Sequence, residues 1–258
     1  MTRRSSSLAA ASLPTAAEAH ATPFPYADFV EAKTSLQRAL RDQPFYGLVT
    51  GASGMGKTSL LREIAAALDR HRHHLVYISS SKASLQGVLR CLAQTLHLSP
   101  RRSYLETVRI FAEAIRAQTA HLLLWIDEAD QVEADTLQEV RMLAESDLGE
   151  EPLLSVVFSG LPPLLARLDA PSLFPLKRRI ALRCQLAGLR REELEPFLRH
   201  RFGAEDAARI SEVVRADLFE RTRATPALID QVVRIALLRH RGNLDADAIR
   251  AILDLHGL

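Results

Sequence analysis

The chain has 258 residues, 47% of them hydrophobic and 25% charged, and its formal net charge is +2. This length suffices for one large or two modest domains with a buried core, and the composition is that of an ordinary globular protein. The small net charge excludes a surface that is basic throughout, and no apolar run approaches the ~20 residues that a membrane-spanning helix needs.

Residues 1–22 are rich in Ser and Ala and predict a disordered tail. Arg3-Arg4 ahead of small residues leaves an export signal as a minor alternative, but the middle of the segment is short and weakly apolar for one. Cys91 and Cys184 have neither ligand-like spacing nor a disulfide framework. We therefore expect both to be buried thiols of a cytoplasmic, reducing compartment, and we expect no membrane attachment.

From about Val30 to Leu186, short apolar runs typical of buried strands alternate with patterns of helical periodicity. The expected strands cover residues 45–50, 74–80, 122–126, 153–160 and 179–184, and the expected helices cover 30–40, 57–68, 85–96, 105–117 and a segment capped by Asp135. This alternation predicts an α/β fold with a doubly wound parallel sheet.

Beyond Leu186 the strand pattern disappears, and helices are expected over residues 190–202, 204–214, 226–239 and 245–255. Pro196 makes the first of these start later or kink. Thr225 is a candidate cap of the third, with Pro226 in its first turn. The predicted domains are therefore an α/β domain over 23–186 and a small helical domain over 187–258.

The octapeptide GASGMGKT satisfies the pattern G-x-x-x-x-G-K-[ST] and lies between an expected strand and an expected helix, the context that this phosphate-binding loop requires. Its glycines let backbone N–H groups and a helix N-terminus face phosphates. Lys57 supplies a charge at the β- and γ-phosphates, and the Thr58 hydroxyl is a Mg²⁺ ligand. The expected ATP-binding residues are Gly51, Ala52, Ser53, Gly54, Met55, Gly56, Lys57, Thr58 and Ser59.

The apolar run LLLWI ends in Asp127-Glu128, which places both carboxylates at the carboxyl edge of a parallel sheet, where ligands bind in such folds. Asp127 is expected to hold Mg²⁺, and Glu128 to orient and activate the attacking water. The letters DEAD suggest an RNA helicase. A helicase of that class needs a second, similar domain, for which the ~70 residues after Leu186 carry no strand pattern, so we reject it.

Two further positions are candidates for contacts with ATP. Ser159 ends an expected strand and would lie within reach of the γ-phosphate or the attacking water, although serine at a strand end is common. Arg178 and Arg179 precede the last strand, where an arginine can reach the nucleotide of a neighbouring subunit as a finger; a solvated basic turn is the alternative.

These segments, with LQEVRMLAESD, SVVFSGLPPLLARL, LKRRIALRCQLAGLRREELEPFLRHRF and TRATPALIDQVVRIAL, resemble the AAA+ superfamily, and more closely its ExeA-like group, which includes TnsC-type transposition regulators. The resemblance covers about Phe24 to Leu253. It implies a three-layer P-loop NTPase domain followed by a helical lid over Gly188–Leu258. It also implies that Ser159 is sensor 1 and that Arg179 occupies the position of the arginine finger, with Arg178 adjacent to it.

One departure from the family concerns the lid. Its members often carry an arginine after the proline of the third lid helix, whereas Ala227 follows Pro226 here. A sensor-2 contact with the γ-phosphate is then missing or supplied elsewhere, so slow turnover is compatible with this sequence.

The resemblance implies an ATP-hydrolysing, ATP-bridged homo-oligomer that acts as a switch on duplex DNA and engages a transposase or another partner protein. Basic groups available for DNA phosphates are Arg70, Arg72, Lys177–Arg179, Arg199–Arg201 and Arg239–Arg241. A secretion-type assembly ATPase, a helicase loader and a nucleotide-gated adaptor with little turnover stay open as alternatives. His71, His73 and His74 lack a carboxylate or cysteine beside them and indicate a solvated turn rather than a metal site.

Overall fold

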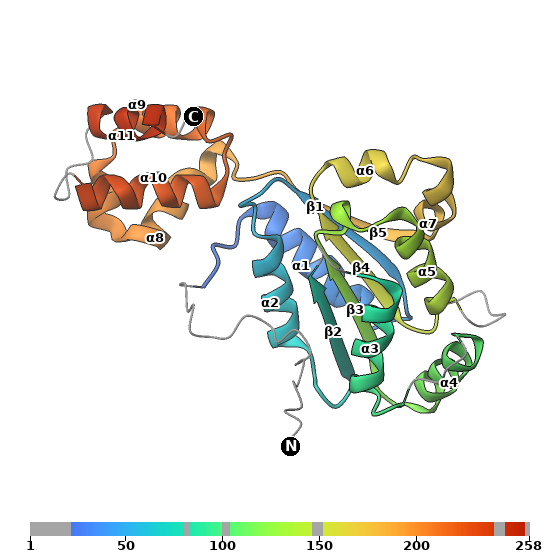
Figure 1. Ribbon diagram of the computed structural model, residues 1–258. Coiled ribbons are helices and arrows are strands. Elements are labelled where there is room, and N and C mark those ends of the chain that lie inside the picture. Colours follow the sequence, from blue (N-terminus) through green and yellow to red (C-terminus); the bar gives the residue numbers. More distant parts are fainter. Residues whose placement is uncertain (1–21, 80–82, 100–103, 146–151, 240–245, 256–258) are drawn as a thin grey trace, which may run out of the picture. The chain divides into compact units, whose positions relative to one another are not determined.

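The computed structural model describes residues 22–79, 83–99, 104–145, 152–239 and 246–255 (Figure 1). The predicted tail lies outside these residues, apart from Thr22. Contacts divide the chain into two units. The sheet unit contains Ser35–Thr50 and Arg62–Arg183, and the loop unit contains residues 22–34, Gly51–Leu61 and Cys184–Leu258 within the described ranges.

The described strands form one five-stranded sheet in the order β2-β3-β4-β1-β5. Their bounds are β1 Tyr46–Gly51, β2 His73–Ser79, β3 His121–Asp127, β4 Ser155–Gly160 and β5 Ile180–Leu186. The pairs β2–β3, β3–β4 and β1–β4 are parallel. Because spatial neighbours are distant in the chain, crossover segments connect them, and the predicted α/β class is confirmed.

Five of the helices before β5 follow the predicted order, and α6 Pro163–Arg167 and α7 Phe174–Arg179 were not predicted (Figure 1). The five are α1 Ala27–Ala39, α2 Lys57–Ala67, α3 Leu85–Thr95, α4 Tyr104–Ala117 and α5 Ala134–Ala144, and short 3₁₀ turns also occur, η2 Ala129–Gln131 and η3 Pro171–Leu173. The predicted cap of α5 was wrong. Glu133 occupies the N-cap without a side-chain hydrogen bond. Asp135 lies in the first turn, where its negative charge interacts favourably with the helix dipole.

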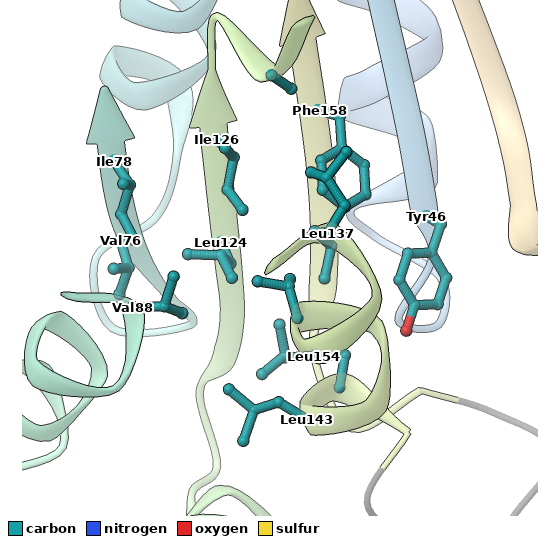
Figure 2. Packing of buried hydrophobic residues seen from close by; sticks show 14 of the residues in the cluster. Tyr46, Val76, Ile78, Val88, Leu124, Ile126, Leu137, Leu143, Leu154 and Phe158 are labelled. Carbon is teal, nitrogen blue, oxygen red and sulfur yellow. The ribbon is translucent and has the colours of Figure 1, made fainter. Parts of the chain in front are cut away.

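One large cluster of buried apolar residues of the sheet unit packs against one face of the sheet. Figure 2 shows Leu124 and Ile126 of β3 and Phe158 of β4 beside Leu137 and Leu143 of α5. Since side chains alternate between the two faces of a strand, the residues between these point to the other face. Tyr77, Trp125, Asp127 and Ser159 therefore share the face opposite this core.

The loop unit ends in four helices, preceded by the 3₁₀ turn η4 Arg191–Glu193: α8 Leu194–Arg209, α9 Glu212–Arg221, α10 Pro226–Arg239 and α11 Ala246–Leu255. α8 begins later than residue 190, as Pro196 predicted. This proline lies in the first turn of the helix, where proline is tolerated. The bounds expected for the third and fourth helices are confirmed to within one residue.

The helix expected over 204–214 begins after the non-helical Gly203, as predicted, but its expected end at 214 was wrong. Residues 204–209 belong to α8, which kinks at Gly203, and Ser211 then caps α9 by accepting a hydrogen bond from the Val214 N–H at 3.4 Å. The buried residues Ala207, Ile210 and Val214 continue a helical spacing across this cap, so periodicity alone did not reveal the break. Within the described residues, no helix is long and apolar enough to cross a membrane.

Candidate active site

The phosphate-binding loop connects β1 to α2, which begins at Lys57 as predicted. Gly54 and Gly56 have φ angles of 82° and 95°, a region that residues with a Cβ rarely adopt. The Lys57 ammonium donates to the Gly51 carbonyl at 2.7 Å and to the Ala52 carbonyl at 3.1 Å. The loop thus has the left-handed glycines and the helix N-terminus that phosphate binding requires.

Other segments of the loop unit contact the loop from both sides. The Tyr26 hydroxyl donates to the Met55 carbonyl at 2.6 Å. At the start of α10, the Ala227 N–H donates to the Gly54 carbonyl at 3.3 Å, and a Cβ on Gly54 would lie 2.9 Å from the Ala227 Cβ. The small side chain at 227 therefore accompanies a direct backbone contact between α10 and the loop.

At the other half of the predicted site, the carboxyl ends of β1, β3 and β4 lie at one edge of the sheet because these strands are parallel. Thr50 is paired with Gly160, so the loop that starts at the next residue leaves the sheet at this edge. Asp127 ends β3 and is 6% exposed. The expectation that Asp127 lies at the carboxyl edge is thus met by the geometry of the sheet unit.

Glu128 differs sharply from Asp127. Its side chain is exposed, and its backbone has φ 50° and ψ 38°, the left-handed conformation. Its N–H donates to Asp127 Oδ1 at 3.0 Å. A residue with a side chain is held in this region at a cost of ~1–3 kcal/mol, and such strain clusters at functional sites.

A chain of hydrogen bonds holds the Asp127 carboxylate. The Trp125 indole N–H donates to Ser159 Oγ at 2.8 Å, and the Ser159 hydroxyl donates to Asp127 Oδ1 at 2.6 Å. The Tyr77 hydroxyl donates to Asp127 Oδ2 at 3.3 Å. Burial, followed by the charges of Asp127 and Glu128, raises the pKa of Tyr77 to about 12, so this phenol stays a donor at physiological pH.

Tyr77 and Trp125 were not among the residues predicted for the site. The sequence contained a usable signal for both residues. Each lies two residues before the end of its strand, a spacing at which side chains point to the same face of a sheet. The contact itself depends on the register between strands. Of the predicted residues in the sheet unit, the structure therefore brings Asp127 and Ser159 together.

Asp130, the last letter of DEAD, has a structural role. Its Oδ1 accepts a hydrogen bond from the Leu161 N–H at 2.8 Å and so ties η2 to the segment after β4. The Arg167 guanidinium donates to the carbonyls of Ala129, Asp130 and Val132. The bond from the Leu161 N–H gives the Asp130 carboxylate a role within the fold, without any reference to a helicase.

The two finger candidates lie at the end of α7, and both are exposed. A cavity of about 370 Å³ is lined by Arg141, Pro175, Arg178 and Arg179. Arg179 Nε lies 3.1 Å from Glu145 Oε1, without the alignment of a hydrogen bond, and Glu145 Oε2 lies 2.5 Å from Arg141 Nη1. Glu145 thus joins two of the arginines that surround this cavity.

Some of the basic residues expected to be available for DNA take part in ion pairs. Arg201 lies 2.8 Å from Asp230, and both side chains are less than one-fifth exposed. Arg199 pairs with Glu195 and Lys177 with Asp169. Arg70 and Arg72, in contrast, are exposed on the turn before β2, and of the group at 239–241 only Arg239 is described. Much of the arginine content therefore serves the folded structure.

The histidines near β2 also have partners in the fold. His73 Nε2 lies 3.2 Å from the Leu40 carbonyl, and the rings of His73 and His121 are 5.9 Å apart. In the described part of the chain, no group of three or more His, Cys, Asp or Glu side chains is arranged to hold a metal ion.

Residues 41–168 of this chain match the family described as an AAA domain. General secretion pathway protein A of Aeromonas hydrophila is 26% identical over 176 residues, which cover 66% of this chain and 32% of that protein. The chain thus spans about a third of the length of this curated relative.

Solved structures with the same fold include Cdc6p from Pyrobaculum aerophilum, with a TM-score of 0.64, 18% identity and coverage of 90% of this chain and 67% of that one. The Aeropyrum pernix ORC2 protein in ADPNP-ADP complexes has a TM-score of 0.60 and 15% identity, with coverage of 88% and 66%. The Aeropyrum pernix ORC1 protein in complex with DNA has a TM-score of 0.58 and 17% identity, with coverage of 90% and 65%. This chain therefore contains an AAA domain with the P-loop fold of the AAA+ ATPases and is a homologue of general secretion pathway protein A.

Proposed function

We propose that this chain binds Mg²⁺·ATP and hydrolyses it. Lys57 and Thr58 of the loop and Asp127 and Glu128 at the end of β3 would act on one triphosphate. The observation that carries the proposal is the contrast between buried, hydrogen-bonded Asp127 and exposed, strained Glu128, at the sheet edge from which the loop departs. A fixed cation ligand beside an accessible base is what the hydrolysis of a bound nucleotide requires.

In this proposal each residue has one task. The loop amides and Lys57 bind the phosphates, while Thr58 and Asp127 supply oxygen ligands of the kind that Mg²⁺ prefers. When bound, Mg²⁺ supplies charge that neutralises the phosphate oxygens during transfer. Glu128 orients a water molecule and accepts its proton.

Calorimetry with a non-hydrolysable ATP analogue tests the binding step. Lys57→Ala is expected to weaken binding roughly ten- to hundredfold, because a charge-assisted hydrogen bond contributes ~1.5–3 kcal/mol. Lys33→Ala, which removes the same charge from α1, is the matched control and should bind as the wild type does. Equal binding heats for Lys57→Ala and the wild type would remove the loop from the proposal.

We further propose that the chain is an ATP-bridged homo-oligomer in which Arg179, or Arg178 beside it, reaches the nucleotide of a second copy. The exposure of both arginines around an open cavity supports this assignment. The specific rate of hydrolysis should then rise with protein concentration. Arg179→Ala should abolish this rise and Arg178→Ala should retain it, and the opposite pattern would transfer the role to Arg178.

As its partner we propose duplex DNA, in a switch similar to transposition regulators that engage a transposase. The support is the ExeA-like resemblance, the ORC1 relative solved in complex with DNA, and the exposed pair Arg70 and Arg72. A gel shift with and without a non-hydrolysable ATP analogue tests it, since phosphate contacts make binding weaken with salt. Replacing Arg70 and Arg72 by alanine should reduce the shift more than replacing Arg90 and Arg116, and salt-insensitive or absent binding throughout would exclude this partner.

A secretion-type assembly ATPase is the second candidate, favoured by the match to general secretion pathway protein A. Cross-linking of the protein in its cells, followed by identification of the partner, separates the two. A transposase supports the DNA switch, and a component of a secretion apparatus supports the assembly ATPase. A helicase loader would instead be found with a replicative helicase.

A further inference from the structure

We infer that Ser159 is a positioning residue for Asp127, held in that role by Trp125, and that it does not donate a hydrogen bond to the terminal phosphate. This inference rests on the proposed function, because it concerns how the Mg²⁺ ligand Asp127 is oriented. It departs from the sensor role predicted for Ser159 from the sequence.

The number of hydrogen atoms on each group fixes the direction of the bonds at Ser159. A serine hydroxyl has one O–H to donate and two lone pairs that accept. The Trp125 indole can only donate, so the 2.8 Å contact occupies one Ser159 lone pair. At 2.6 Å from Asp127 Oδ1, the Ser159 O–H is donated to the carboxylate. The phosphate oxygens of ATP are acceptors, and Ser159 has no second hydrogen to offer them.

Burial makes this arrangement persistent. Ser159 and Trp125 are both 0% exposed, and Asp127 is 6% exposed. If Ser159 turned its hydrogen towards a phosphate, Asp127 Oδ1 would lose that bond, and rotation of the hydroxyl oxygen would leave the indole N–H without a partner in the interior. A buried N–H group is rarely left in that state, because loss of its acceptor in the interior costs the full desolvation penalty.

The geometry also shows what the chain of bonds does for Asp127. Ser159 and the Glu128 N–H bind one carboxylate oxygen, and Tyr77 binds the other. Donors at both oxygens restrict rotation of the carboxylate and so set the direction of its remaining lone pairs. Groups that orient a metal ligand in this way typically alter metal affinity when they are removed.

The experiment measures the Mg²⁺ concentration that half-saturates binding of a fluorescent, non-hydrolysable ATP analogue. Ser159→Ala should raise this concentration about tenfold, as expected for loss of a group that orients a metal ligand, while binding in the absence of Mg²⁺ stays unchanged. Trp125→Phe keeps the ring and deletes the N–H, and it should shift the requirement in the same direction by less. Ser155→Ala, a buried serine at the other end of β4, is the matched control and should not shift it.

A second readout is independent of hydrolysis. Trp125 is the only tryptophan of the chain, so its emission reports directly on this bond chain. Addition of Mg²⁺ with the analogue should change the emission of the wild type and of Ser155→Ala. In Ser159→Ala, the variant that breaks the link from indole to carboxylate, the change should be lost or at least halved. Ser159→Thr retains a hydroxyl and should restore both readouts, and circular dichroism verifies that each variant is folded.

The inference is overturned if Ser159→Ala leaves the Mg²⁺ requirement and the emission change as in the wild type. A lower rate of hydrolysis with an unchanged Mg²⁺ requirement would likewise overturn it, in favour of a phosphate sensor. These outcomes leave the proposed function standing. Failure of the wild type to bind the analogue with Mg²⁺ would remove the proposed function and this inference together.

Discussion

The two ends of the β3–β4 strand pair each contain a buried serine of β4 that contacts a polar side chain of β3, but the surroundings of the two serines differ. At the amino end, His121 Nε2 of β3 lies 2.7 Å from Ser155 Oγ of β4, and this oxygen accepts a hydrogen bond from the Phe45 N–H at 3.2 Å. At the carboxyl end, Ser159 donates to Asp127 and accepts from Trp125. Each end thus has a fully buried serine that connects a polar side chain of β3 to a third group.

The difference lies in the charge and accessibility of what surrounds each serine. The amino end opens on a cavity of about 580 Å³ whose lining includes Leu40, Arg41, Asp69, Arg72, His73 and His121, a set of mixed charge. The carboxyl end has Asp127 and Glu128, and β1 ends at the same edge of the sheet. A buried serine that bridges two strands is therefore by itself only a structural feature. Adjacent carboxylates at the carboxyl edge of a parallel sheet are what distinguish a candidate ligand-binding site.

Glu128→Gln gives the largest expected effect of any change at the carboxyl end. Loss of the base should lower the rate of ATP hydrolysis by about 10²–10⁴-fold, the usual contribution of a general base, and should leave binding of Mg²⁺·ATP intact. Steady-state hydrolysis and analogue binding measure the two quantities. Asp130→Asn is the control, because an amide oxygen still accepts from the Leu161 N–H. Equal rates of hydrolysis by the wild type and Glu128→Gln would remove Glu128 from the mechanism, and negligible hydrolysis by the wild type itself would indicate a nucleotide-gated adaptor.

Replacing each serine by alanine tests the comparison most directly. Both Ser155→Ala and Ser159→Ala leave buried polar groups without a partner, so each should lower the free energy of unfolding by ~1–3 kcal/mol. Urea denaturation measures this loss. Similar losses of stability, together with a change in Mg²⁺ requirement for Ser159→Ala alone, would show that both serines stabilise the fold and that only Ser159 affects Mg²⁺ binding. A change in Mg²⁺ requirement for both variants would contradict the distinction between the ends.

The smallest expected effect is a dependence of stability on pH at the amino end. Burial, followed by the charge of His73, lowers the pKa of His121 below its ordinary value of 6.5. Between the lowered pKa and 6.5 the unfolded chain binds more protons than the folded chain, so stability falls as pH falls through this window and is fully present above 6.5. His121→Gln should flatten that part of a stability–pH curve, whereas His71→Gln, on the exposed turn, should not. An unchanged slope in His121→Gln would assign the dependence to other groups.

Local features of the fold were predictable from the sequence. The bounds of β1 and the start of α2 follow from an apolar run and a loop motif that require no distant contact. Two errors, the cap of α5 and the end of the helix expected over 204–214, concern element ends. At the second, a hydrogen bond from the Val214 N–H to the Ser211 side chain starts a new helix, and periodicity carries no record of this bond.

The order of the amino acids was enough to identify the phosphate loop, the acidic pair at 127–128 and the α/β class, because each depends on neighbours along the chain and on alternation within one strand. Tertiary structure decided the partners. Trp125 reaches Ser159, Asp130 reaches the Leu161 N–H and Arg201 reaches Asp230 only after strands and helices have assembled. Strand register and helix packing bring these groups together, and a shift of β3 by one residue would turn Trp125 and Asp127 to the opposite face and break their bonds with Ser159 and Tyr77.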